Sequence, residues 1–164
     1  MSLNKFIPHV YVIPEDRANE EIANGFINHD QVKARQIQVL PCGTGWCSVR
    51  DKFRIEYVPY LRTYPKGHVV MLIDFDGGYA NRLAEFEQVI PDDLKERVFV
   101  VGTGKTPEDL KKMLGKHFEP IGKSLADDCF AGTETVWSHE QLKHNDPDRQ
   151  RLVQTVKPIL FGTL

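Results

Sequence analysis

The sequence predicts a single α/β domain, a four-stranded and mostly parallel sheet flanked by helices. Two observations lead to this fold class. Segments of strand and helix character alternate four times along the chain with short connections, which is the order of a parallel sheet covered by helices. The third strand segment, residues 68–73, contains five consecutive apolar residues, as expected of a strand buried on both faces.

Proline residues and side-chain spacing delimit the elements in the first half of the chain. After a short β-rich run, Ala18, Ile22 and Phe26 recur at helical spacing. The next strand stops before Pro41, and Pro59 is expected to kink or split the helix that follows. We therefore expect strands at residues 9–13, 37–40 and 68–73 and helices at residues 18–26 and 46–64.

Capping residues delimit the second half. Thr106 is a favourable N-cap, and Pro107 suits the first position of the helix after it. That helix ends near Gly115. We expect a fourth strand at residues 97–102 and helices at residues 80–89, 107–114, 121–130 and 148–160.

The composition excludes several classes of protein. No run is long and apolar enough to cross a membrane, and the N-terminus lacks the charged-then-apolar pattern of a signal peptide. The three cysteines are too few for a disulfide framework and odd in number, which suits the reducing cytoplasm. We expect one domain over residues 1–164, with a helical C-terminal extension over about residues 120–164.

Two carboxylates follow the buried third strand. Asp74 and Asp76 are one residue apart and precede two glycines, so both can face the carboxyl end of the strand, where α/β proteins bind ligands. Two like charges so close are costly unless a divalent cation neutralises them or one keeps its proton. An ordinary turn with a helix cap is the simpler alternative. Two acids after a wholly apolar strand favour a site.

Glu15 ends the first strand as Asp74 ends the third. If these strands are neighbours in a parallel sheet, all three acids meet at one edge. Three converging carboxylates form a hard-oxygen site for Mg²⁺ or Mn²⁺, which suits phosphoryl chemistry. The alternative for Glu15 is an acid at a helix N-terminus, favoured by the helix dipole.

A glutamate after the first strand and an Asp-x-Asp two strands later resemble the TOPRIM domain of topoisomerases, primases and OLD-type nucleases. The resemblance implies that Asp74 and Asp76 hold Mg²⁺ and that Glu15 is the catalytic acid or base and a further metal ligand. It covers roughly residues 10–104. It implies cleavage of a nucleic-acid phosphodiester bond by a small stand-alone member, like those linked to bacterial defence. Asp16 and Tyr79 stand where the family usually has glycine, so altered chemistry or an inactive TOPRIM-like fold stays open.

The same stretch is similar to the first motif of the haloacid dehalogenase superfamily, in which Asp74 would be a phosphoryl nucleophile and Asp76 its acid–base partner. Thr103 would be the second motif, and residues 127–128, both aspartate, the last pair. Two observations oppose this interpretation. Gly78 stands where that motif usually has Thr or Val. That family also carries the motif on the first strand of the domain, whereas here two strand–helix units precede it. A third alternative is a catalytically inactive α/β module that interacts with a partner protein.

Basic residues supply candidate contacts to a substrate, although the net charge of −2 does not by itself indicate a nucleic-acid binder. Arg50 and Arg54 lie in a stretch where basic and aromatic residues alternate, which is typical of surfaces that follow a phosphate backbone. A solvated helix face explains that pattern equally well. Lys105 lies in a Gly-Thr-Gly-Lys turn that lacks the first glycine of a phosphate-binding loop, but it can still contact a phosphate.

Overall fold

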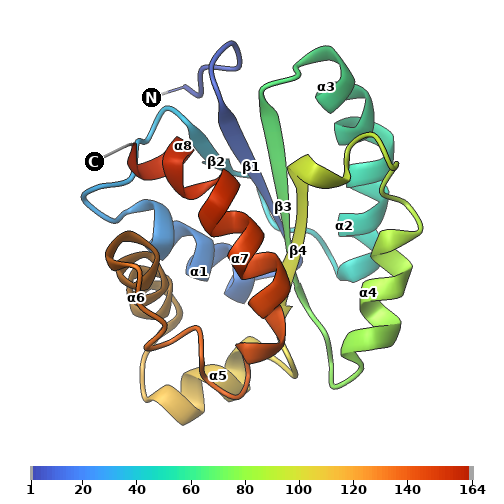
Figure 1. Ribbon diagram of the computed structural model, residues 1–164. Helices are drawn as coiled ribbons and strands as arrows, with labels where there is room; N and C mark the ends of the chain where they lie inside the picture. Colours follow the sequence, from blue (N-terminus) through green and yellow to red (C-terminus); the bar gives the residue numbers. More distant parts are fainter. Residues whose placement is uncertain (1, 163–164) are drawn as a thin grey trace.

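The computed structural model describes residues 2–162 and contains a parallel four-stranded sheet with helices on both faces (Figure 1). The order of the strands is β2-β1-β3-β4, and every neighbouring pair is parallel. This confirms the predicted fold class. The strands are β1 (His9–Pro14), β2 (Ile37–Val39), β3 (Gly67–Asp74) and β4 (Val98–Thr103).

The register of the sheet aligns the carboxyl ends of its central strands. Pro14 of β1 is paired with Leu72 of β3, and Asp74 of β3 is paired with Thr103 of β4. The residues that follow β1, β3 and β4 therefore lie at a common edge, as the sequence predicts for a parallel sheet.

Two groups of helices cover the sheet. On one face lie α2 (Trp46–Lys52), a π-helical segment (Phe53–Tyr57), α3 (Val58–Thr63) and α4 (Tyr79–Glu87). On the other face lie α1 (Arg17–Ile27), α5 (Pro107–Leu114), α6 (Phe118–Ala131), α7 (Asp146–Thr155) and α8 (Lys157–Phe161). Two short 3₁₀ helices cover Lys95–Arg97 and Lys143–Asn145. No helix within residues 2–162 has the length and apolar character needed to span a membrane.

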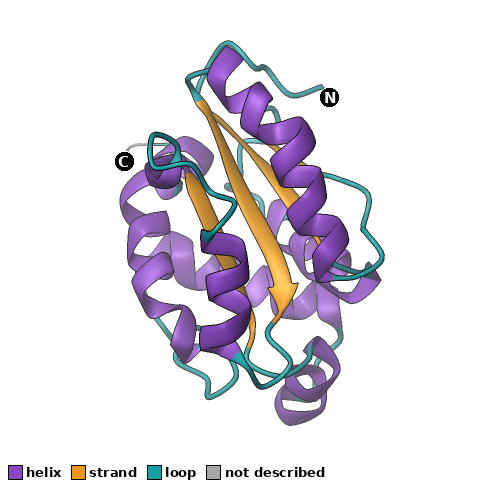
Figure 2. Ribbon diagram, turned by 90° about the vertical axis from the view of Figure 1, so that its right-hand side faces the viewer, coloured by secondary structure: helices purple, strands orange, loops and turns teal. Residues whose placement is uncertain are grey.

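The helix expected at residues 46–64 is one helical run with a π-helical insertion (Figure 2). Pro59 has no N–H to donate to the preceding turn. The run widens before it, where the Val58 N–H bonds to the Phe53 carbonyl five residues back. The widened turn lets the chain pass the proline without breaking the helix, which explains why the expected split is only a local change of helix type.

The C-terminal helices also differ from expectation. The single helix expected at residues 148–160 is two helices, α7 and α8, separated at Val156. Pro158 occupies the start of α8, because a proline fits the first turn of a helix but not its interior. The helix expected at residues 121–130 begins three residues earlier, at Phe118.

Glycines allow α1 and α6 to pack closely. A Cβ atom on Gly25 of α1 would lie 2.0 Å from the Glu119 carbonyl oxygen. A Cβ atom on Gly122 of α6 would lie 1.9 Å from the Ile22 carbonyl oxygen. Only residues without a side chain permit this approach of the two backbones, so the sequence of both helices specifies their contact.

Candidate active site

Glu15 lies directly after β1, beside the end of β3. Its N–H donates to the Leu72 carbonyl at 2.9 Å, which extends the pairing of β1 with β3 by one residue. Its side chain is 6% exposed, and Oε2 accepts a hydrogen bond from the Asp74 N–H at 2.5 Å. The Glu15 carboxylate is therefore held against the backbone of Asp74.

Asp74 is the last residue of β3 and is 7% exposed. Its Oδ1 accepts a hydrogen bond of 2.8 Å from the side-chain amide of Asn19 in α1. Asn19 is itself held by Asp16, the N-cap of α1, whose Oδ1 accepts both the backbone and side-chain N–H groups of Asn19 at 3.0 Å. Sequence reasoning missed Asn19. The signal for it is that an N-cap at Asp16 places Asn19 in the first turn, facing the same edge of the sheet.

Asp76 lies in the loop after β3, in a left-handed conformation with φ of 51°. Its N–H donates to the Lys105 carbonyl at 3.1 Å, and the next N–H, of Gly77, donates to the Gly104 carbonyl at 2.7 Å. The side chain of Asp76 is about half exposed, and its Oδ2 lies 3.2 Å from Nη1 of Arg82. The loop after β3 is thus fastened to the loop after β4, with the Asp76 carboxylate turned to Arg82.

The structure brings Glu15 and Asp74 together, with Asp76 close by on the same edge. Within residues 2–162, no three acidic, histidine or cysteine side chains are arranged as ligands of one metal ion. Glu15 and Asp74 are buried, whereas Asp76 is about half exposed and engaged in an ion pair with Arg82.

Burial and mutual repulsion change the acidity of the two buried carboxyls. Burial, together with the negative charges of Glu15, Asp16 and Asp76, raises the pKa of Asp74 to about 8, against a smaller effect of the Asn19 hydrogen bond. Burial also raises the pKa of Glu15, and the hydrogen bond from the Asp74 N–H opposes it. Near neutral pH the Asp74 carboxyl therefore keeps a proton, unless a cation replaces it.

Arg82 is the second residue that sequence reasoning missed. It lies on α4, and its Nη1 donates to the Asp74 carbonyl at 2.9 Å as well as to Asp76. Its guanidinium stacks on Trp46 at 4.4 Å, and Arg50 lies over the same ring at 5.2 Å. The signal for Arg82 is its place in the first helical turn after the Asp-x-Asp loop, from which a long side chain reaches back to the loop.

The three basic residues expected to contact a substrate lie at different places. Arg50 is joined to Arg82 through Trp46 and lies 3.6 Å from Glu85. Lys105 is in the loop that bonds to Asp76. Arg54 is more than half exposed and lies 3.9 Å from Asp51. Arg50 therefore lies near Arg82, and the backbone of Lys105 contacts Asp76, whereas Arg54 pairs with Asp51 of the same helical run.

The residues of the phosphatase motif separate into two groups. Thr103 is paired with Asp74 across β3 and β4, and its buried hydroxyl makes no hydrogen bond within residues 2–162. Asp127 and Asp128 lie in α6. Asp127 pairs with His29 at 2.9 Å, and the Asp128 carboxylate accepts hydrogen bonds from the turn that follows α6, including one of 2.6 Å from Val136 N–H. These two aspartates do not join Asp74.

Comparisons with models of known protein families, with curated proteins and with solved structures gave no match to this chain. The structure itself shows a small α/β domain with a four-stranded parallel sheet. The resemblance to TOPRIM domains rests on Glu15, Asp74 and Asp76 and on the order of the elements that carry them.

Proposed function

We propose that this protein is a metal-dependent phosphoryl-transfer enzyme that cleaves nucleic-acid phosphodiester bonds. The observation that carries the proposal is the pair of buried carboxyls, Glu15 and Asp74, at the carboxyl ends of neighbouring parallel strands. Ligands of α/β sheets bind at this edge. Burying two neighbouring acids opposes folding. We therefore infer that the pair is retained for a function, and the TOPRIM resemblance supplies one.

The donor set fits Mg²⁺ or Mn²⁺. Magnesium is commonly held by one or two carboxylates together with substrate phosphates, and Asp74 and Asp76 would hold it here, with Glu15 beside them. Asp76, whose side chain is about half exposed, becomes available when its ion pair with Arg82 opens. A bound cation would offset the charge that develops on the phosphate.

The residues of the chain have separate tasks in this reaction. Glu15, whose pKa is raised by burial, moves a proton to or from the attacking or leaving oxygen. Arg82, once released by Asp76, turns to a phosphate oxygen, and its stacking on Trp46 keeps the guanidinium in place. Arg50 and Lys105 hold the flanking backbone, which predicts binding that weakens with salt.

The test uses Glu15→Gln and Asp74→Asn, with Glu108→Gln as a control at an exposed acid on α5. We expect Glu15→Gln to bind Mn²⁺ but to lose ~10²–10⁴-fold in cleavage rate on labelled oligonucleotides, since it lacks the acid–base group. Asp74→Asn should weaken Mn²⁺ binding in calorimetric titration, and the control should match the wild type. Equal Mn²⁺ affinity in wild type and Asp74→Asn would remove the metal site.

One observation favours a second candidate, a phosphatase that uses Asp74 as nucleophile. The buried Thr103 hydroxyl has no hydrogen-bond partner within residues 2–162 and lies on the strand beside Asp74, where it would hold a phosphate that enters this edge. This mechanism predicts turnover of a chromogenic phosphomonoester that survives Glu15→Gln and is abolished by Asp74→Asn. Intact metal binding without turnover of either substrate class would instead indicate an interaction module.

A further inference from the structure

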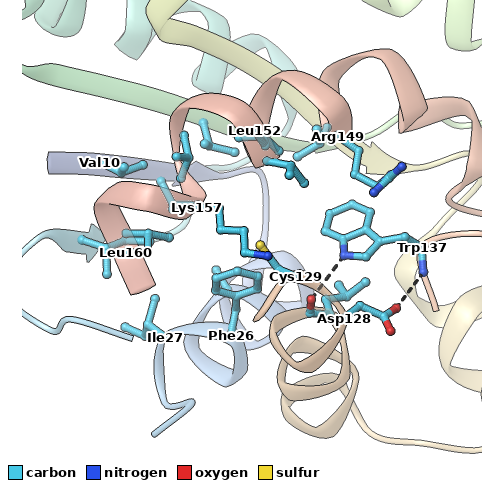
Figure 3. A pocket seen from close by; sticks show the side chains of 18 of the residues that line it. Val10, Phe26, Ile27, Asp128, Cys129, Trp137, Arg149, Leu152, Lys157 and Leu160 are labelled. Atoms are coloured by element: carbon cyan, nitrogen blue, oxygen red, sulfur yellow. Dashed lines mark hydrogen bonds between the residues drawn. The ribbon is translucent and has the colours of Figure 1, made fainter. Parts of the chain in front are cut away.

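An apolar cavity of about 190 Å³ lies between the sheet and the helices α1, α6, α7 and α8 (Figure 3). It reaches the middle of the sheet, because Val70 and Leu72 of the central strand β3 line it and remain partly exposed. Val69, Met71 and Ile73 point to the other face of the same strand and are fully buried. The walls are mainly aliphatic and aromatic, and include Val12, Phe26, Leu125, Trp137, Leu152 and Leu160.

Among the described residues, one charged group in the cavity wall has no partner. Asp128 in its wall is saturated by hydrogen bonds from the turn after α6. Arg149 is paired with Asp146 at 3.0 Å and with Glu134. By contrast, Lys157 makes no ion pair or side-chain hydrogen bond among the described residues, and its amine points inward beside Cys129 (Figure 3).

We propose that this cavity binds a small apolar molecule with a single carboxylate, of the size of hexanoate. The alkyl part would lie against Val70 and Leu72, and the carboxylate would pair with the Lys157 ammonium. The assignment does not depend on the proposed phosphoryl chemistry, which uses the carboxyl edge of the sheet.

Two physical arguments support this ligand class. An apolar cavity of roughly 150 Å³ stays dry and takes up molecules such as benzene, so a cavity of about 190 Å³ is large enough for an apolar ligand. A partly buried ammonium is stabilised when it donates a charge-assisted hydrogen bond to a carboxylate. A phosphate dianion needs several donors, and within residues 2–162 the cavity offers one uncompensated cation.

The first experiment uses the wild-type chain and its own cysteines. Cys129 lines the cavity, whereas Cys47 is exposed on α2. We expect hexanoate to slow alkylation of Cys129 by N-ethylmaleimide and to leave Cys47 unchanged, as read by peptide mass spectrometry. Hexanol and hexylamine, which lack the anionic group, should protect much less. Equal protection by all three, or none by hexanoate, would overturn the proposal.

Variants then separate charge from shape by calorimetry with hexanoate. Lys157→Gln should weaken hexanoate binding about tenfold, the loss of one charge-assisted hydrogen bond, and leave hexanol binding unchanged. Val70→Phe fills the cavity and should abolish hexanoate binding, with the far-ultraviolet circular dichroism of the folded protein retained. Lys123→Gln, on the exposed side of α6, is the matched control. Hexanoate affinity that is the same in Lys157→Gln and Lys123→Gln would contradict the proposed ion pair.

Discussion

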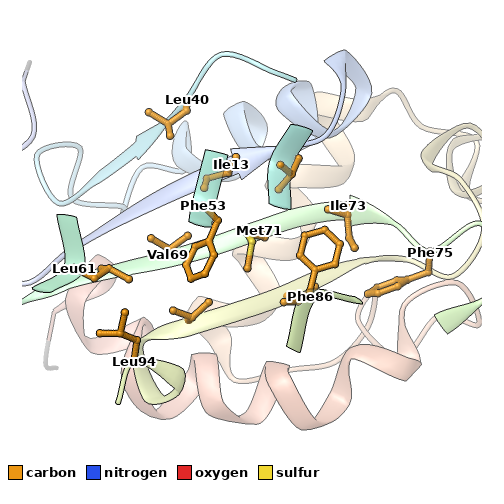
Figure 4. Packing of buried hydrophobic residues seen from close by; sticks show 13 residues of the cluster. Ile13, Leu40, Phe53, Leu61, Val69, Met71, Ile73, Phe75, Phe86 and Leu94 are labelled. Atoms are coloured by element: carbon orange, nitrogen blue, oxygen red, sulfur yellow. The ribbon is translucent and has the colours of Figure 1, made fainter. Parts of the chain in front are cut away.

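The two faces of the sheet are packed differently although each contains several apolar residues of the same strands. Under α2, α3 and α4, the β3 side chains of Val69, Met71 and Ile73 are fully buried (Figure 4). On the opposite face, Val70 and Leu72 of the same strand are partly exposed to the cavity. Alternate residues of a strand face opposite sides, so the same strand supplies both sets of side chains. We therefore attribute the difference in burial to the helices that cover each face.

The covering helices explain the difference. The filled face is covered by one continuous helical run and α4, whose aromatic side chains Phe53 and Phe86 are fully buried in the core. The hollow face is covered by two separate helix pairs, α1 with α6 and α7 with α8, and the cavity is lined by residues of all four. Close packing of α1 on α6 through Gly25 and Gly122 does not by itself close the space beside the second pair.

The largest expected effect tests the packing difference directly. Phe53→Ala on the filled face should lower the free energy of unfolding by about 3–5 kcal/mol, since a fully buried ring leaves a cavity that the core cannot close. Phe26→Ala, at a partly buried ring on the hollow face, should cost roughly 1–2 kcal/mol. Urea denaturation of both variants measures this, and equal losses would show that the two faces are packed alike.

Asp74, at the carboxyl edge of the sheet, is expected to make the free energy of unfolding depend on pH. The pKa of Asp74 is about 8 in the folded protein against its usual 3.8, so the folded state binds more protons than the unfolded state between these pH values. The free energy of unfolding of the metal-free protein should therefore fall as pH rises from about 4 to about 8. Asp74→Asn should remove this fall in the free energy of unfolding, which is on the order of a few kcal/mol.

The measurement is the difference between wild type and Asp74→Asn in urea denaturation at several pH values. The difference is needed because burial lowers the pKa values of His9, His68 and His144, and these groups stabilise the fold as pH rises through the histidine range. The raised pKa of Glu15 acts in the same direction as that of Asp74. Parallel pH profiles of the two proteins would contradict the raised pKa of Asp74.

The smallest expected effect uses two neighbouring valines. Val69→Leu adds a methylene to the filled face and should destabilise the fold by about 1–3 kcal/mol through overpacking. Val70→Leu adds the same group toward the cavity and should be neutral or stabilising by up to ~1 kcal/mol. Thermal unfolding compares the pair under one condition. A larger loss for Val70→Leu would show that the cavity wall does not admit further volume.

The predictions made from sequence fared differently for strands, helices and site residues. The apolar run of residues 68–73 and the alternation of elements were enough to predict the parallel sheet, and the parallel order was enough to expect Glu15 near Asp74. Helix ends near Pro59 and Pro158 were less predictable, because a proline excludes one hydrogen bond but leaves open how the chain adapts.

By itself, then, the sequence determined the fold class and the edge at which the acids of β1 and β3 lie, because strand periodicity and parallel order are local properties of the chain. Only the tertiary structure decided that Asn19 holds Asp74, that Arg82 pairs with Asp76, and that a cavity lies beside Val70. These features depend on how helices distant in sequence approach the sheet. That approach is set by packing of whole helix surfaces, which no local pattern of residues records.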